Sequence, residues 1–112
     1  MKFGLLTAIL EGTTFEEAVD FAAENQLECL EVACWPNTGG AKRRYAGVCH
    51  IDAEELTEEK AKEIIQYCKE RNVEISSLGY YPNTLDPDLE KRKQYIDHIY
   101  ALIDASSMLN VN

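Results

Sequence analysis

The chain alternates between short, nearly continuous apolar runs and longer segments in which apolar residues recur every three or four positions. Residues 3–10 are apolar apart from Thr7, a composition typical of a strand buried on both faces. Residues 28–34 and 73–79 form two further runs of strand length. A segment with helical spacing follows each run, so the pattern predicts a repeated alternation of strand and helix.

The first two predicted helices carry both a buried stripe and end signals. In residues 12–25, Thr13 and Thr14 each stand three positions before a glutamate, which is the spacing of a capping box. Residues 57–72 begin with acidic and end with basic side chains, an order that the helix dipole favours. The stripes predicted to face the core are Phe15, Ala18, Val19 and Ala22 in the first helix and Ala61, Ile64, Ile65 and Cys68 in the second.

A third helix is predicted to begin with Asp86 as its N-cap and Pro87 as its first helical residue, the preferred position for proline. It is expected to end near Ser106 and Ser107. Residues 108–112, with the sequence MLNVN, then look like the opening of a fourth strand. The stripe predicted to be buried in this helix consists of Leu89, Ile96, Ile99, Tyr100 and Ile103.

Strands and helices in this alternation predict right-handed βαβ units and a parallel sheet, which places the protein in the α/β class. The 112 residues suit a single domain with a real core, since 46% of them are hydrophobic. A sheet of three or four strands with helices on one side leaves its other face bare and two edges unpaired. We therefore interpret residues 1–112 as part of a larger structure, or as one protomer of an assembly that covers that face.

Composition disfavours several classes of partner. The formal net charge is −9, from 20 acidic and 11 basic residues, so nucleic acid and anionic membrane surfaces would repel the chain. The four cysteines, at positions 29, 34, 49 and 68, lack any C-x-x-C pair. They are interpreted as buried or half-buried thiols of a reducing compartment, in preference to a disulfide or zinc framework. No apolar run approaches the length of a membrane span, and a cytoplasmic protein is expected.

Two strand exits share an aromatic-Pro-Asn motif, at residues 35–37 and 81–83. In parallel α/β folds, ligands gather at the carboxyl ends of the strands, where both motifs are expected to lie. Trp35 and the pair Tyr80 and Tyr81 are therefore candidates for an apolar wall beside a polyhydroxylated ligand. Core packing at the base of the loops is the alternative.

The asparagines of the two motifs, Asn37 and Asn83, could hydrogen-bond ligand hydroxyls. Asparagine after proline is also ordinary turn chemistry, and the sequence favours that interpretation.

Glu31 is a carboxylate within an apolar strand. Because side chains alternate along a strand, Glu31 shares a face with Cys29 and Ala33, away from the aliphatic face that packs on the helices. It would point into the interior of a barrel if one forms. A carboxylate there needs a hydrogen-bonded or charged partner, so an internal salt bridge and a direct substrate role both remain open.

The connection at residues 35–56 is long for a loop between strand and helix, which makes it a functional candidate. Its basic cluster at 42–44 could attract a phosphate, although a solvated loop is favoured. His50 and Asp52 could form an acid–base pair, but Asp52 is equally well explained as the cap of a short turn. His50 remains a candidate for ligand contact.

Three segments resemble a known family: LECLEVACWPN at 27–37, HID at 50–52 and EISSLGYYPN at 74–83. In this order and spacing they resemble the amino-terminal part of the xylose isomerase-like TIM-barrel superfamily, in its sugar phosphate isomerase/epimerase branch. The likeness runs along essentially the whole chain. It implies an eight-stranded (β/α)8 barrel, of which the chain would be the amino-terminal half, with about three βα units and the start of a fourth strand.

The resemblance implies isomerases and epimerases of carbohydrates, which move a proton between sugar carbons with the help of a divalent metal ion. The family's metal ligands come from later strands, so tight metal binding by this chain alone is not expected and no catalytic residue is assigned. The residues carried over as walls of a pocket for a sugar or sugar phosphate are Glu31, Trp35, His50, Tyr81 and Asn83. The family also includes abasic-site DNA nucleases, which the net charge disfavours.

A TIM barrel takes about 250 residues, more than twice the length of this chain. The chain is therefore expected to be a truncated fragment, a deliberately made half-barrel or a natural short protein that forms a homodimer, and to be inactive alone. The alternative function is a non-catalytic half-barrel module that self-associates through its exposed sheet.

Overall fold

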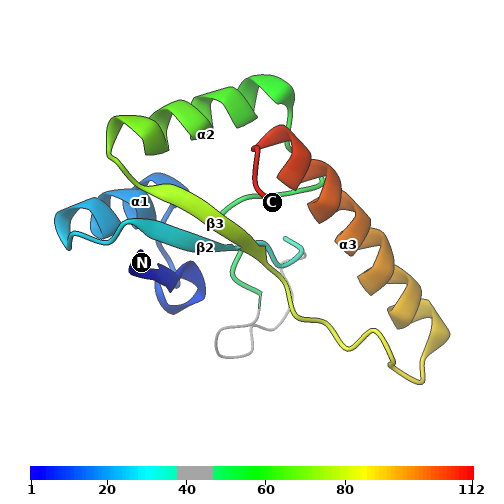
Figure 1. Ribbon diagram of the computed structural model, residues 1–112. Helices are drawn as coiled ribbons and strands as arrows, with labels where there is room; N and C mark the ends of the chain where they lie inside the picture. Colours follow the sequence, from blue (N-terminus) through cyan, green and yellow to red (C-terminus); the bar gives the residue numbers. More distant parts are fainter. Residues whose placement is uncertain (38–46) are drawn as a thin grey trace.

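The computed structural model describes residues 1–37 and 47–112 and has the α/β architecture expected from the sequence (Figure 1). Its sheet has three parallel strands in the order β1-β2-β3. The strands are β1 (Gly4–Leu6), β2 (Cys29–Ala33) and β3 (Glu74–Gly79). The helices are α1 (Phe15–Glu24), α2 (Glu58–Glu70) and α3 (Leu89–Met108), with a short 3-10 helix, η1 (Thr7–Ile9).

The first strand is much shorter than the predicted 3–10. β1 ends at Leu6, and the chain turns into η1 because the Thr7 hydroxyl accepts a hydrogen bond from the Ala33 N–H at 2.8 Å. A side chain thus supplies a contact that the backbone would make in a longer strand. The prediction of burial on both faces was also wrong, since Gly4 is exposed. A Cβ on Gly4 would lie 2.2 Å from the Cys29 carbonyl oxygen, so β1 pairs this closely only through a glycine.

All three helices contribute to one core against the same face of the sheet. At the centre of this core lie Leu30 and Val32 of β2 and Cys34 directly after the strand, which alternate along the chain and are fully buried. The opposite face carries Ala33, which belongs to a separate, smaller cluster. The alternation predicted for this strand is therefore confirmed. The helical side chains in the main core are Phe15, Val19 and Ala22 of α1, Ala61, Ile64 and Cys68 of α2, and Leu102 and Ala105 of α3.

The capping signals of the first two helices work as the sequence predicts. Thr14 accepts from the Glu17 N–H and the Glu17 carboxylate accepts from the Thr14 N–H, which completes a capping box. Thr57 caps α2 by accepting from the Lys60 N–H. These local bonds fix where each helix begins.

The start of α3 corrects two predictions. The N-cap is Asp88, whose carboxylate accepts from the Glu90 and Lys91 N–H groups, and Pro87 lies outside the helix. Asp86 belongs to the preceding turn, where its side chain accepts from the Asp88 N–H and its carbonyl from the Arg92 guanidinium. Two aspartates two residues apart could each cap the helix, and the one that satisfies two N–H groups does so.

The buried face of α3 is not the predicted stripe. His98, Leu102 and Ala105 are buried, whereas Leu89, Ile96, Tyr100 and Ile103 are exposed. The helix carries apolar residues on two opposite faces, and the face with a histidine at its centre packs on the core. Periodicity alone could not separate the two faces, because the helix has nearly equal apolar content on both.

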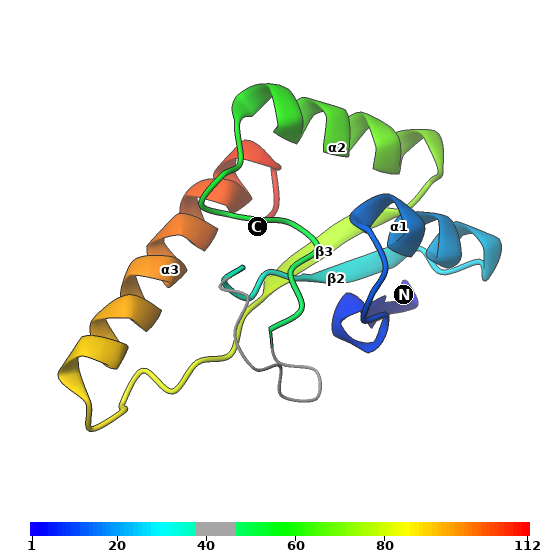
Figure 2. The same cartoon turned by 180° about the vertical axis from the view of Figure 1, so that it is seen from behind.

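The end of the chain also differs from expectation. Residues 108–112 do not form a strand, because Asn110 adopts a positive φ of 55° and Val111 donates its N–H back to the Ser106 carbonyl. This turn closes α3 and brings its carboxyl end near the beginning of α2, as both views show (Figures 1 and 2). Within the described ranges, none of the helices combines the length and hydropathy of a bilayer-spanning segment.

Candidate functional site

A cavity of about 980 Å³ lies at the carboxyl ends of β2 and β3, roofed by the first half of α3. The two aromatic-Pro-Asn motifs supply one side of it, and α3 supplies the other. Its location agrees with the rim where parallel α/β folds bind ligands. The lining residues are Trp35, Pro36, Gly47 and Glu54, then Tyr80, Tyr81, Pro82, Asn83 and Asp86, and Lys91, Gln94, Tyr95, Asp97 and His98.

The two strand exits meet through their aromatic rings. The ring centroid of Trp35 lies 5.8 Å from that of Tyr81 and 6.0 Å from that of Tyr80, both in edge-to-face geometry. Tyr81 is 65% exposed, so one of its faces is open to solvent, whereas Tyr80 is half-buried beneath it. An aromatic pair of this kind stabilises a protein by about 0.5–1.5 kcal/mol in addition to the burial of its apolar area, and here it holds the rings as a fixed wall.

Backbone hydrogen bonds set the positions of these rings. The Cys34 N–H donates to the Gly79 carbonyl, which ties the exit of β2 to the end of β3. The Trp35 N–H donates to the Val48 carbonyl, so the returning loop fixes the tryptophan backbone. Asn83 accepts from the Leu85 N–H, which confirms the turn chemistry expected for it, although its side chain also lines the cavity.

His98 is the buried polar group of the cavity. It is only 3% exposed, its Nε2 lies 2.7 Å from the Cys34 carbonyl oxygen, and its Nδ1 lies 3.1 Å from a carboxylate oxygen of Glu54. A carbonyl can only accept, so Nε2 donates to it. The Nδ1 contact then needs one further proton, carried either by the ring or by Glu54. Tyr80 stacks edge-on against the imidazole at 4.6 Å.

His98 and Glu54 were missed from the sequence. His98 stands in a helix where the apolar pattern drew attention to its neighbours, and Glu54 belongs to an acidic stretch of ordinary appearance. A buried polar residue of a helix can be recognised in the sequence as a candidate functional residue only when the buried face of that helix is known. The wrong assignment of the α3 face therefore hid the residue most deeply placed in the cavity.

Glu31 lies away from this cavity, on the face of the sheet opposite the helices, as its position in β2 predicts. A Cβ on Gly79 would lie 3.2 Å from a carboxylate oxygen of Glu31, so the glutamate lies over β3 at a position that has no side chain. Among the described residues, Glu31 has no side-chain hydrogen bond or ion pair. An internal salt bridge is thus not formed within the described part of the chain.

His50 also lies apart from the cavity. Its Nδ1 contacts the Thr7 hydroxyl at 2.8 Å and its Nε2 contacts the Thr13 hydroxyl at 3.1 Å. Thr7 already accepts from the Ala33 N–H, so its hydroxyl hydrogen is available to donate to Nδ1 of a neutral ring. Burial lowers the pKa of His50 below its ordinary value of 6.5, which agrees with a neutral ring.

Asp52 does not pair with His50. Its carboxylate accepts from the Glu54 N–H at 3.1 Å, so the capping interpretation is confirmed and the acid–base pair is wrong. The basic cluster at 42–44, for which a solvated loop was favoured over a phosphate site, lies outside the described residues.

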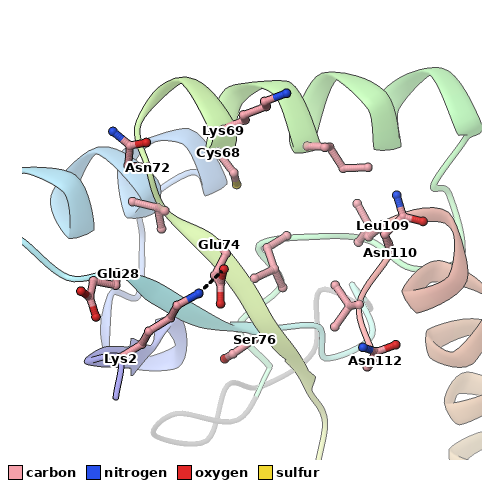
Figure 3. A pocket seen from close by; sticks show the side chains of 14 residues that line it. Lys2, Glu28, Cys68, Lys69, Asn72, Glu74, Ser76, Leu109, Asn110 and Asn112 are labelled. Atoms are coloured by element: carbon pink, nitrogen blue, oxygen red, sulfur yellow. Dashed lines mark ion pairs between the residues drawn. The ribbon is translucent and has the colours of Figure 1, made fainter.

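A second cavity, of about 850 Å³, lies at the opposite, amino-terminal end of the sheet (Figure 3). Lys2 and Glu74 form an ion pair at 2.7 Å across the start of β3, and the chain end from Leu109 to Asn112 forms the far side. In open parallel α/β sheets, ligands bind in the crevice outside the carboxyl ends of the strands, which is the other end of this sheet. We therefore place the candidate site at the carboxyl rim.

Among the described residues we find neither a cluster of metal ligands nor a reactive thiol. No three His, Cys, Asp or Glu side chains gather closely enough to hold a metal ion within residues 1–37 and 47–112. The described residues therefore do not fit the divalent metal of the resembled family. All four cysteines are free, and burial raises the pKa of Cys34 to about 12 and the pKa values of Cys49 and Cys68 to about 11. Thiols with such pKa values carry little nucleophilic thiolate at neutral pH.

Comparison with known proteins adds no family assignment. No protein-family model matches the chain, and no curated protein matches it as a relative.

Proposed function

We propose that the cavity at the carboxyl ends of β2 and β3 binds a small polyhydroxylated ligand, a sugar or sugar phosphate. The observation that carries the proposal is the fixed aromatic wall of Trp35 and Tyr81 facing the polar groups of α3 across one cavity. An aromatic face packs on the C–H face of a sugar ring, while carboxylates, amides and an imidazole bond its hydroxyls. Convergent polar groups in a partly apolar pocket are the usual composition of a small-molecule site.

The charges of the lining favour a neutral sugar over its phosphate. Glu54, Asp86 and Asp97 bring three carboxylates to the cavity, against one cationic lysine, Lys91. A phosphate would be repelled by these carboxylates at short range, whereas hydroxyl groups donate to them. Within the described lining, a polyol is the better match.

We further propose that the three βα units belong to a (β/α)8 barrel of the sugar isomerase/epimerase type and supply walls of its substrate pocket. Two features of the sheet support this. The strands follow one another in sequence order, and all three helices pack on the same face of β2. A doubly wound sheet would instead place helices on both faces.

Trp35 is the only tryptophan of the chain, so its fluorescence reports on the site directly. We expect saturable changes in emission when neutral pentoses or hexoses are added, with weaker responses to the corresponding phosphates. Tyr81→Ala should weaken the binding about tenfold, because it removes half of the wall. Leu85→Ala is the matched control, since Leu85 is exposed in the same loop and does not line the cavity.

The absence of any saturable response to the whole panel would refute the sugar site. Catalysis is a separate question with a separate assay. We expect no interconversion of aldoses and ketoses by the chain with added Mg²⁺ or Mn²⁺, because the described residues offer no metal centre. Metal-dependent epimerisation by the purified chain would overturn that expectation and leave the binding proposal intact.

A further inference from the structure

The outer face of α3 carries a line of exposed apolar side chains, which we call the outer stripe. Of the ten large apolar side chains exposed in the described residues, four lie on this helix. Tyr100 is 63% and Ile103 58% exposed, on the side of the helix opposite the buried His98. Exposed apolar residues that line up along one element mark a contact surface more often than scattered ones do. The stripe consists of Leu89, Ile96, Tyr100 and Ile103.

Charged residues follow one edge of the outer stripe, with a lysine at its amino end and aspartates toward its carboxyl end. Lys93, Asp97 and Asp104 are spaced by four and then seven residues, which places them on the same edge of the helix. Lys93 already pairs with Asp97, and both are exposed. The cation thus lies toward the amino end of the stripe, and Asp104, which has no ion pair within residues 1–37 and 47–112, lies toward its carboxyl end.

We propose that α3 pairs with α3 of a second copy of this chain in antiparallel orientation, through the outer stripe. Antiparallel pairing about a twofold axis near Ile99 and Tyr100 sets Ile96 of one copy against Ile103 of the other. The same pairing brings each Lys93 beside Asp104 of the second copy. In a parallel pair, the edges that carry Lys93 and Asp104 would lie on opposite sides of the interface and would not meet, so the charge pattern selects the antiparallel arrangement.

A second copy suits this surface for a further reason. A net charge of −9 makes two copies repel at long range, so a self-contact must bring its own opposite charges. The edge of the outer stripe provides two such contacts by symmetry, one between Lys93 of each copy and Asp104 of the other. The stripe lies on the reverse side of α3 from the ligand cavity. None of the four stripe residues lines the cavity, which the charged edge reaches only through Asp97, and the dimer does not depend on the proposed function.

The first test compares two isoleucines of equal exposure. Ile103 in the stripe and Ile9 in η1 are both 58% exposed. Sedimentation equilibrium of the wild-type chain should show a reversible dimer. Ile103→Asp should raise the dissociation constant at least about tenfold, and Ile9→Asp should leave it unchanged. Far-UV circular dichroism checks that both variants stay folded.

A wild-type chain that stays monomeric at all accessible concentrations would overturn the proposal. A dimer that survives Ile103→Asp would overturn it as well, because the contact would then lie elsewhere, on the open sheet or on another partner-binding face.

The second test establishes the orientation by charge reversal. In antiparallel pairing, Lys93→Asp or Asp104→Lys alone should weaken self-association about threefold to tenfold, and an equimolar mixture of the two variants should recover wild-type affinity. Parallel pairing predicts that the single variants and their mixture all associate like the wild type, because Lys93 and Asp104 would not meet across the interface. That result would contradict the antiparallel pair. High salt should reduce the differences.

Discussion

The two histidines of the chain occupy neighbouring places with opposite consequences. His50 donates its backbone N–H to the Ala33 carbonyl, and the His98 imidazole contacts the carbonyl of the next residue, Cys34. The ring of His50 is enclosed by two threonine hydroxyls, whereas His98 contacts a carboxylate and lines a cavity with aromatic walls. The side chain is the same at both positions, so the groups around each imidazole determine which histidine reaches a potential ligand.

This comparison assigns His98 to the candidate site and His50 to the structure around η1. It predicts that both histidines stabilise the fold, but by different amounts and with only one of them linked to the ligand. The next three experiments test that distinction, beginning with the largest effect.

The first experiment replaces the buried imidazole. His98→Ala should lower the free energy of unfolding by about 2–4 kcal/mol, because it leaves a cavity and strips the Cys34 carbonyl of its partner. Urea denaturation measures the loss. Glu54→Gln is the control, since its exposed amide can donate an N–H to Nδ1 of the ring whose Nε2 donates to Cys34, and it should change stability little. Equal stability of His98→Ala and wild type would contradict the buried placement of the ring.

The second experiment replaces the enclosed imidazole. His50→Ala should lower the free energy of unfolding by about 1–2 kcal/mol, the value of two hydrogen bonds to hydroxyl groups. Sugar binding measured by Trp35 fluorescence should be unchanged, because His50 does not line the cavity. A binding defect in His50→Ala without a stability defect would reverse the comparison between the two histidines.

The third experiment uses pH and expects the smallest effect. Burial lowers the pKa of His50 in the folded protein, so below the ordinary value of 6.5 the unfolded chain takes up this proton first. The stability that His50 contributes is therefore present above pH 6.5 and decreases as the pH falls through the lowered pKa. The difference in unfolding free energy between wild type and His50→Ala should shrink on acidification from pH 7.5. A difference that grows would mean that the ring is stabilised in its charged form.

Local patterns in the sequence predicted the fold well where contacts are local. The capping box at Thr14, the order of strands and helices and the two faces of β2 follow from spacing of two to four residues, and they are confirmed. Contacts between distant residues were not predictable. The length of β1 depends on a bond from Thr7 to residue 33, and the face of α3 depends on what Cys34 and Glu54 offer to His98.

The candidate site shows the same division. Trp35, Tyr81 and Asn83 come together because both motifs end adjacent parallel strands, which sequence order implies. Glu31 and His50 were candidates from their places in the second strand and the long loop, and the family resemblance grouped them with the rim. The structure places both outside the cavity. The polar side of the cavity comes from α3. No short-range signal in the sequence specified how this helix is rotated about its own axis.

The assignment of sugar binding to the cavity at the carboxyl ends of β2 and β3 is tested most directly by mapping where a sugar binds. We would label the chain with ¹⁵N and record amide and indole shifts while titrating a neutral pentose or hexose that changes Trp35 fluorescence. If the sugar binds in this cavity, we expect chemical shift changes concentrated at the Trp35 indole, at Tyr80 to Asn83 and around His98. The Thr13 amide and the residues around His50 should be unaffected. Shifts concentrated around His50, or around the cavity between Lys2 and Asn112, would contradict the assignment of the site.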